Sequence, residues 1–402
     1  TLNHEGEFNI KSYWNTPLDG YNNNITENGA AEIIDEAMNN AIKRMCVGDR
    51  IGTLISGGVD SPYISVLSNK WVPNIKALTF GLSNDQFSHM NEHKKAKLTA
   101  DKYAMEHIVK LYDIHDMIDH LDQMVDIYEQ IGASFATNFF LAQIAKENNI
   151  SILLNGLAAD EQHGGFHYFK YIKIWNLIKC IPFSTAFIPR GLSKRIEDLK
   201  NLSTAKSIDE YYSHAFSDFK EFEKKQLFTG GHFNSYESIR NYYQPETPFV
   251  NNIQGLLYYM FANVQNHHLY RFEQFTQHFG IEARYPFLDN ECIDIAFKIP
   301  SNLKIRDGNR KVALKTAASK YIVQESLQKK KIGLIMPMDY LVNDKLKDFC
   351  LDHLNSLKQR DTFSASYIDK LYKKYSKIIP GKIWKLVMME LWFQKFIDKP
   401  YT

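Results

Sequence analysis

Cysteine is scarce in this sequence, and the few that occur lie far apart. Only four are present in 402 residues, at positions 46, 180, 292 and 350, and no two form a Cys-x-x-Cys pair. This spacing argues against both a disulfide framework and a zinc site. It favours reduced thiols in a cytoplasmic protein.

An excess of charge of one sign and long apolar runs are also lacking. The 48 basic and 46 acidic side chains leave a net charge of +2, which predicts no nucleic-acid partner. We find no signal peptide and no apolar run of membrane length. Because 44% of the residues are hydrophobic, the chain can bury a large core. The composition therefore predicts a soluble globular protein that binds neither nucleic acid nor membrane.

The pattern of apolar residues predicts helices that alternate with strands. Residues 1–30 show no period, and we expect an extended arm there. Alternation of this kind indicates parallel βαβ units, whose ligands gather at the carboxyl ends of the strands. The predicted strands are 51–55, 75–80, 107–109 and 150–154; the predicted helices are 31–46, 61–69, 92–103, one from 116 to about 132, and 138–148.

A glycine-rich loop follows the first predicted strand. It reads Ser56-Gly57-Gly58-Val59-Asp60-Ser61 and leads into a helix. Glycines let the backbone approach a ligand, and amides at the start of a helix favour an anion. A carboxylate such as Asp60 beside a phosphate is repulsive unless a cation lies between them, so the loop predicts magnesium pyrophosphate. An ordinary strand-to-helix turn is the alternative; a Walker loop is excluded because Gly-Lys-Ser/Thr is absent.

A second loop of the same kind follows the strand at 150–154. It begins at Asn155 and Gly156, carries the acid pair Asp160-Glu161, and ends in Gly164-Gly165-Phe166. A buried strand in front of the acids favours a loop that faces a ligand over a chance surface loop.

Together the two loops resemble those of the ATP pyrophosphatases, and the second is similar to the asparagine synthetase branch in particular. The resemblance implies an α/β fold with a parallel sheet of the adenine-nucleotide α-hydrolase type, flanked by helices, and a mostly helical C-terminal part. It implies one synthetase domain at residues 31–402, with a nucleotide-binding core at 31–166 and a largely helical substrate-site part at 167–402. We expect no N-terminal glutaminase domain.

The resemblance also implies ligands, ATP and Mg²⁺, and places them. Asp60 and Asp160 would share the magnesium, one from each strand end. The backbone near Leu54, Phe80 and Gly156 would hold adenosine. Ser56, Gly57, Gly58 and Ser61 would hold pyrophosphate.

Two further stretches match the same family. Glu282-Ala283-Arg284-Tyr285-Pro286-Phe287-Leu288-Asp289 resembles its Glu-x-Arg-x-Pro-Phe-Leu-Asp signature, and Arg271 lies where the family has an arginine. Local structure explains most of this motif, because Asp289 can cap a helix at 291–298, so we predict no catalytic role for Glu282 or Arg284. Lys331, in Lys-Ile-Gly-Leu, falls at the family's catalytic lysine, although a lone lysine in a lysine run would ordinarily be solvated surface. An aromatic stripe at 383–396 is predicted to be core.

The implied chemistry has two steps. A carboxylate attacks the α-phosphate of ATP to give an acyl-adenylate and pyrophosphate, and an amine then forms the amide and releases AMP. The second loop departs from asparagine synthetases, which have Gly-Glu-Gly where this chain has Gly156-Leu157-Ala158. Leucine cannot orient ammonia, and amine-using relatives such as β-lactam synthetases and lasso-peptide cyclases depart here too.

We therefore predict an amide ligase whose small-molecule or peptide substrate brings a carboxylate and an amine. Three alternatives stay open: an ammonia-dependent asparagine synthetase fed by a separate glutaminase, a non-catalytic ATP-binding relative, and a tRNA-modifying enzyme. Neutral charge and the lack of a cysteine in any motif disfavour the last. The base for the amine step is also open, with Glu161 and His163 near in sequence.

Overall fold

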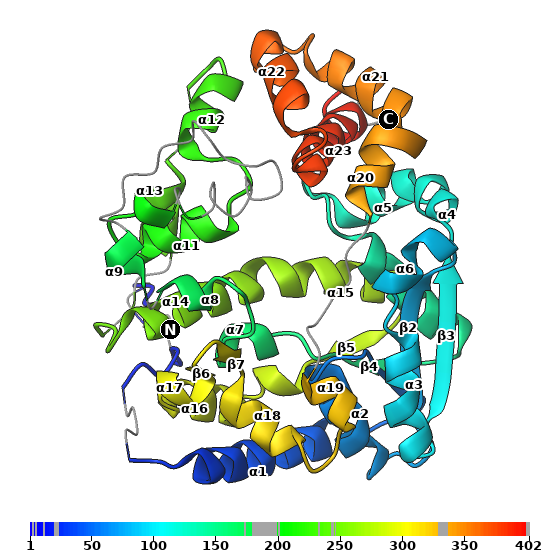
Figure 1. Cartoon of the computed structure of the whole chain (residues 1–402), viewed down its shortest axis with the longest axis vertical. Helices are drawn as coiled ribbons and strands as arrows, with labels where there is room; N and C mark the ends of the chain where they lie inside the picture. Colours follow the sequence, from blue (N-terminus) through cyan, green and yellow to red (C-terminus); the bar gives the residue numbers. More distant parts are fainter. Residues whose placement is uncertain are drawn as a thin grey trace.

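The computed structural model describes residues 24–172, 174–178, 202–231, 234–242, 247–328 and 337–398, and single residues or short pieces outside these ranges. Its centre is a five-stranded parallel sheet with the order β3-β2-β1-β4-β5 (Figure 1). The predicted fold class is confirmed. The strands are β1 (Ile51–Leu54), β2 (Lys76–Leu82), β3 (Glu106–Tyr112), β4 (Ile152–Leu154) and β5 (Glu282–Arg284).

Successive residues of the central strands belong to two different hydrophobic cores. On β2, Ala77 belongs to one hydrophobic cluster and Leu78 to the other. On β4, Ile152 and Leu153 divide in the same way. Because successive side chains of a strand point to opposite faces, each cluster lies on one face of the sheet. Parallel sheets are ordinarily covered on both faces, and this one follows that rule.

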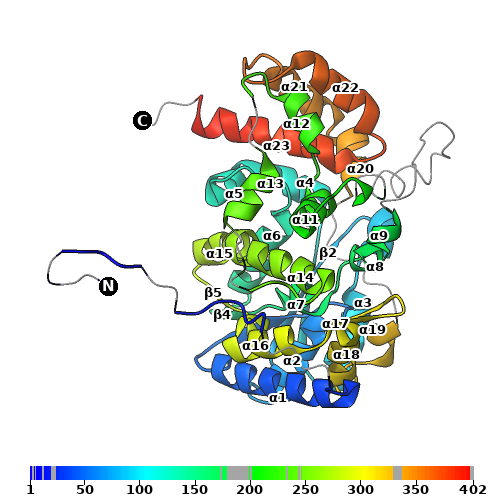
Figure 2. The same cartoon turned by 90° about the vertical axis from the view of Figure 1, so that its left-hand side faces the viewer.

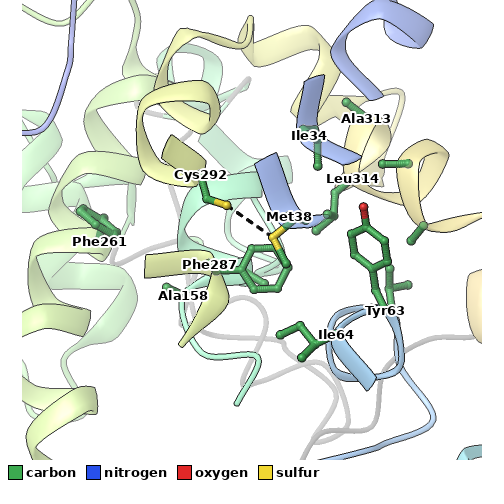
Figure 3. Close-up of a cluster of buried hydrophobic side chains, with 14 of the residues drawn as sticks. Ile34, Met38, Tyr63, Ile64, Ala158, Phe261, Phe287, Cys292, Ala313 and Leu314 are labelled. Carbon is green, nitrogen blue, oxygen red and sulfur yellow. Dashed lines mark hydrogen bonds between the residues drawn. The ribbon is translucent and has the colours of Figure 1, made fainter. Parts of the chain in front are cut away.

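The first core joins the sheet to helices that are far apart along the chain. It includes residues of α1 (Glu27–Met45), α2 (Asp60–Asn69), α14 (Asn252–Asn263), α16 (Asn290–Lys298) and α18 (Val312–Ala318). Figure 3 shows Met38 of α1 against Cys292 of α16, with a sulfur–sulfur distance of 3.6 Å.

The second core joins the sheet to the C-terminal helices, which stack at the top of Figure 1. Its helices are α4 (Ile114–Asp119), α5 (Leu121–Tyr128), α6 (Ala136–Glu147), α15 (Leu269–His278), α21 (Lys347–Leu357), α22 (Ala365–Tyr375) and α23 (Pro380–Phe396).

The remaining elements are short. They are η1 (Asp85–Met90), α3 (His93–Lys102), α7 (Ala159–His163), α8 (Phe169–Ile172), α9 (Trp175–Ile178), α11 (Ile208–Phe216), α12 (Glu221–Leu227), α13 (Ser235–Tyr242), η3 (Val264–His268), η4 (Pro286–Leu288), α17 (Ser301–Lys304), β6 (Ile305–Arg306), β7 (Asn309–Arg310), α19 (Gln324–Gln328), α20 (Met338–Tyr340) and η5 (Leu341–Lys345). None of the described helices is long and apolar enough to cross a membrane.

Several predicted boundaries need correction. The first helix starts inside the predicted arm, at Glu27, because the Thr26 side chain accepts a hydrogen bond from Gly29 N and caps it. Residues 116–149 contain not two helices but most of three, and the chain leaves the helix after Tyr128 rather than near Gly132. The strand β5 was not predicted.

The N-terminal arm leaves the body of the molecule (Figure 2). Leu18 of this arm contacts the body, since it is buried and its carbonyl accepts a hydrogen bond from Gln254 Nε2 at 3.1 Å.

A buried ion pair ties the segment before residue 250 to the C-terminal helices. Lys382 Nζ of α23 lies 2.6 Å from Glu223 Oε2 of α12, and the Tyr375 hydroxyl donates to Glu223 Oε1 at 2.9 Å. Removal of one partner from such a pair leaves a buried charge, which ordinarily costs about 3–5 kcal/mol. This pair therefore helps to fix where α12 lies.

The buried Lys304 at the end of α17 predicts a pH-dependent stability. It is 3% exposed, its Nζ lies 5.3 Å from the centre of the Phe297 ring, and burial lowers its pKa from 10.5 to about 7. Between these two values the unfolded lysine still holds a proton that the folded one has lost, so unfolding free energy rises with pH. Relative to Lys304→Met, the wild-type protein should gain up to about 1.4 kcal/mol per pH unit above about pH 7. Urea unfolding at several pH values measures this. Lys298→Met, at an exposed site, is the control; a pH-independent difference for Lys304→Met would contradict the expectation.

Candidate active site

The loop between β1 and α2 turns its serine hydroxyls inward. Ser61 Oγ accepts from Ser56 N at 3.0 Å and lies 2.9 Å from Ser56 Oγ, which accepts from Gly58 N at 3.2 Å. Asp60 follows as the first residue of α2, and the residue as a whole is 7% exposed. The hydroxyls and amides that the sequence predicts for pyrophosphate are thus gathered in one turn, where they hydrogen-bond to one another.

The glycines of this loop provide space rather than unusual backbone angles. Neither Gly57 nor Gly58 has a positive φ. A Cβ at Gly57 would lie 2.9 Å from both Cβ and Cδ of Lys95 on α3. At Gly57 a side chain is therefore excluded by close packing against a neighbouring helix.

The second loop joins β4 to α7 beside the first one. Gly156 lies against the start of α2, where a Cβ would be 3.4 Å from Ser61 N. Ala158 has a φ of 77°, a left-handed conformation that non-glycine residues seldom adopt. This turn starts α7, which presents Asp160 and Glu161. Since β1 and β4 are parallel neighbours, both loops open at the same edge of the sheet.

A lysine that the sequence analysis missed joins the two loops. Lys311 Nζ lies 2.7 Å from each carboxylate oxygen of Asp60 and 2.6 Å from Asp160 Oδ1. Its side chain is 7% exposed, against 10% for Asp60 and 21% for Asp160. The three charges form a largely buried cluster in which one cation is shared by two carboxylates.

Asp60 and Asp160 line a cavity of about 900 Å³. Its apolar part includes side chains from the end of β2, among them Phe80, which stacks on Phe140 with ring centres 5.9 Å apart. Leu54 and Gly156 also line it, so the three positions predicted for adenosine meet in one place. Asn91 holds the end of β2 by accepting from Leu82 N at 2.8 Å and donating to Leu82 O at 2.7 Å.

Another part of the wall carries polar groups. Arg271 and His268 come from the adjacent elements α15 and η3. Burial lowers the pKa of Arg271, and in the part of the chain that the structure describes its Nε has no hydrogen-bond partner. Burial and then the Arg271 charge lower the pKa of His268 to about 3, so this imidazole is neutral.

The two groups considered as base for the amine step differ in position. Glu161 lines the cavity, although it is only 5% exposed. His163 does not line it: it is buried with its ring centre 6.0 Å from that of Phe287, and burial holds its pKa well below the usual range.

The site fits a magnesium ion that arrives with phosphates. No group of three or more His, Cys, Asp or Glu side chains with the arrangement of a metal site occurs among the described residues. Mg²⁺ ordinarily takes one or two carboxylates, with water and substrate phosphates completing its shell. Asp60 and Asp160 already converge on a single cation, the Lys311 ammonium. They would supply the oxygen ligands for such an ion.

Three other residues of the family motifs, Glu282, Arg284 and Asp289, do not line the cavity. Lys331 is outside the described residues. Glu282 and Arg284 pair with each other at 2.7 Å, and Arg284 also donates to the carbonyls of Met45 and Val47. Asp289 accepts from Glu291 N at 3.1 Å and so caps α16, as expected.

The family follows from comparison with known proteins. A family model for asparagine synthase matches residues 34–394. The chain belongs to the asparagine synthase family. The family and fold that the loops predicted are thereby confirmed.

Relatives are distant and longer. The asparagine synthetase [glutamine-hydrolyzing] 1 of Bacillus subtilis (strain 168) is 24% identical over 421 residues, which cover 100% of this chain and 65% of the relative. A putative asparagine synthetase [glutamine-hydrolyzing] of Mycobacterium tuberculosis (strain ATCC 25618 / H37Rv) is 21% identical over 375 residues, 89% of this chain and 56% of the relative. The chain thus spans less than two thirds of the length of these relatives.

A substitution at Gly165 tests whether the position of Asp160 matters for metal binding. A Cβ there would overlap Asp160 Oδ1 and Lys311 Cε, so Gly165→Ala should push Asp160 out of position. Disturbing the groups that orient a metal ligand ordinarily costs about 10- to 100-fold in affinity. We expect that loss for a non-hydrolysable Mg-ATP analogue, measured by calorimetric titration. Gly230→Ala, whose Cβ would have no atom within 4 Å, is the matched control and should bind as wild type does. Equal binding by both variants would contradict the predicted metal position.

Proposed function

We propose that this chain is an ATP-dependent amide ligase that adenylates a substrate carboxylate and transfers the acyl group to an amine of a larger substrate. The observation that carries this proposal is the pair Asp60 and Asp160, which meet on one cation at a cavity of about 900 Å³. A protein that only binds ATP would not need two carboxylates beside the phosphates.

In the first step a carboxylate oxygen of the substrate bonds to the α-phosphorus of ATP, and the bond from that phosphorus to pyrophosphate breaks. Asp60 and Asp160 would hold Mg²⁺, which neutralises charge on the phosphates. The amides and hydroxyls of the first loop would receive the departing pyrophosphate. Lys331 is proposed to offset charge that grows on the α-phosphate.

In the second step the amine nitrogen bonds to the acyl carbon, the bond to AMP breaks, and the nitrogen loses a proton. Leu157 lines the cavity where asparagine synthetases have a glutamate. An apolar wall cannot orient ammonia by hydrogen bonds. It suits an amine that is positioned by the rest of its own molecule, because such positioning makes the step effectively intramolecular.

A second cavity supports a substrate larger than aspartate. It has a volume of about 220 Å³ and shares Thr137 with the first cavity. Its other lining residues are mostly apolar and carry no charge: Met117, Leu121, Ala133, Ser134, Phe135, Ala136, Met338, Trp384 and Met388. A cavity of about 150 Å³ with aliphatic and aromatic walls binds benzene, and methionines adapt to varied shapes. We assign this cavity to an apolar side chain of the acyl substrate.

Arg271 supplies an anchor for an anion. A guanidinium this buried, with no acidic partner among the described residues, is stabilised when a carboxylate or phosphate enters the cavity. We propose that it binds an anionic group of the substrate.

The names of the relatives favour a second candidate. If a separate glutaminase delivers ammonia, this chain would make asparagine from aspartate.

The first test compares these candidates directly. With Mg-ATP, aspartate and ammonium, we expect no asparagine above an Asp60→Asn blank, measured by product mass. ATP–pyrophosphate exchange measured across a panel of carboxylic acids needs no amine and should show adenylation of a larger acid. Lys331→Ala should lower that exchange by about 100-fold or more and leave ATP binding intact. Asparagine above the blank would establish the second candidate, and ATP binding without exchange for any acid would leave a non-catalytic relative.

The second cavity predicts a preference among acids. Exchange with leucine or phenylalanine should exceed exchange with glycine. Ala136→Phe, which places a ring in the cavity, should lower exchange with leucine or phenylalanine by about 10- to 100-fold, since burial of such a side chain is worth about 1.5–3 kcal/mol. Exchange with glycine is the internal control and should hardly change. An equal loss of exchange for every acid would mean that Ala136→Phe disturbs the fold, and it would contradict the assignment of the second cavity to the side chain of the acid.

A further inference from the structure

Lys311 occupies the place where the metal charge is expected. Its Nζ donates to both oxygens of Asp60 and contacts Asp160 Oδ1, at 2.6–2.7 Å. Magnesium sits about 2.1 Å from its oxygen ligands. An ion that binds these three oxygens would overlap the ammonium, so the two cations cannot share one position.

We propose that Lys311 is a positioning residue that holds the Asp60–Asp160 pair closed to divalent cations until nucleotide arrives, and then moves to a phosphate oxygen. This inference rests on the proposed function, which assigns the pair to Mg²⁺. With the lysine in place, an added Mg²⁺ would lie beside a second cation in a largely buried site, and the two would repel each other. The incoming phosphates supply anionic oxygens to which the lysine can move.

The carriers of the three charges are fixed to one another. Tyr63 and Ile64 of α2, Ala158 at the start of α7, and Ala313 and Leu314 of α18 lie in the same buried cluster (Figure 3). Asp60, Asp160 and Lys311 are each within four residues of these anchors. The carboxylates are thus held at a set separation, whether or not the lysine lies between them.

The lysine itself has the means to move. Its ammonium is a point charge on a flexible four-carbon stem. It follows the β6–β7 hairpin, whose residues Gly308 and Arg310 line the main cavity. We expect a turn of this stem to bring the ammonium from the carboxylates to a phosphate in that cavity.

Metal binding without nucleotide tests the proposal. In electron paramagnetic resonance titrations without ATP, Mn²⁺ should bind Lys311→Met at least about tenfold more tightly than it binds the wild-type protein, a difference of about 1.4 kcal/mol. Lys311→Arg keeps the charge and should resemble wild type. Lys320→Met is the matched control, because it removes a lysine paired with Asp35 at 2.7 Å, away from the carboxylate pair. Adding Asp60→Asn to Lys311→Met should abolish the gain.

A second measurement uses the wild-type protein and so does not depend on whether the variant folds. Crystals soaked in Mn²⁺ alone should show no anomalous peak between Asp60 and Asp160. Crystals with Mn²⁺ and a non-hydrolysable ATP analogue should show the peak, with Lys311 Nζ moved to a phosphate oxygen. A peak without nucleotide, or a lysine that stays on Asp60 beside the bound metal, would overturn the proposal. Failure of the proposed ligase function would instead appear as absent pyrophosphate exchange, which neither measurement uses.

Discussion

One buried ammonium shared by two carboxylates is the interaction on which the geometry of the site depends. Asp60 and Asp160 come from the ends of neighbouring strands, and like charges so close would repel without a cation between them. Their partner lies 251 residues from Asp60 along the chain, on a hairpin and helix that the sheet does not include. The fold therefore has to bring β1, β4 and α18 together before the charges can balance. The shared hydrophobic core under these elements provides that constraint.

The sequence predicts what local patterns determine. The strands β1, β2 and β4 are apolar runs with both faces buried, and both glycine loops follow directly from their ends. Strand β5 was missed because Glu282-Ala283-Arg284 is short and charged, and it is a strand only through its pairing with β4. Strand β3 was predicted too short because, at the edge of the sheet, its apolar residues are interrupted by charged ones and only Tyr112 is buried; Val109 is 38% and Leu111 43% exposed.

Lys311 shows why part of the site could not be predicted from the sequence. A lysine after a Gly-Asn-Arg turn and before a helix is predicted to be an exposed surface residue. The one available signal is the apolar run Val312-Ala313-Leu314 directly after it, which indicates that the start of this helix is buried. That signal places the lysine near a core, but its partners are set by tertiary contacts alone. The same limit applies to Arg271, because the sequence does not show that it has no acidic partner among the residues that the structure describes.

Leu157 links the fold to the second half of the proposed chemistry. It packs against both hydrophobic cores and also lines the cavity, so it joins the two faces of the molecule at the active site. A glutamate there would have to be solvated or paired within this apolar contact. With leucine, the wall is apolar instead, and in the proposed reaction such a wall would help to keep water from an acyl-adenylate while the amine is brought into place. Ammonia gains nothing from such a wall, because it has no apolar surface to bury. An amine carried on a larger molecule does, and this difference is the physical basis for preferring a condensation or cyclisation over asparagine synthesis.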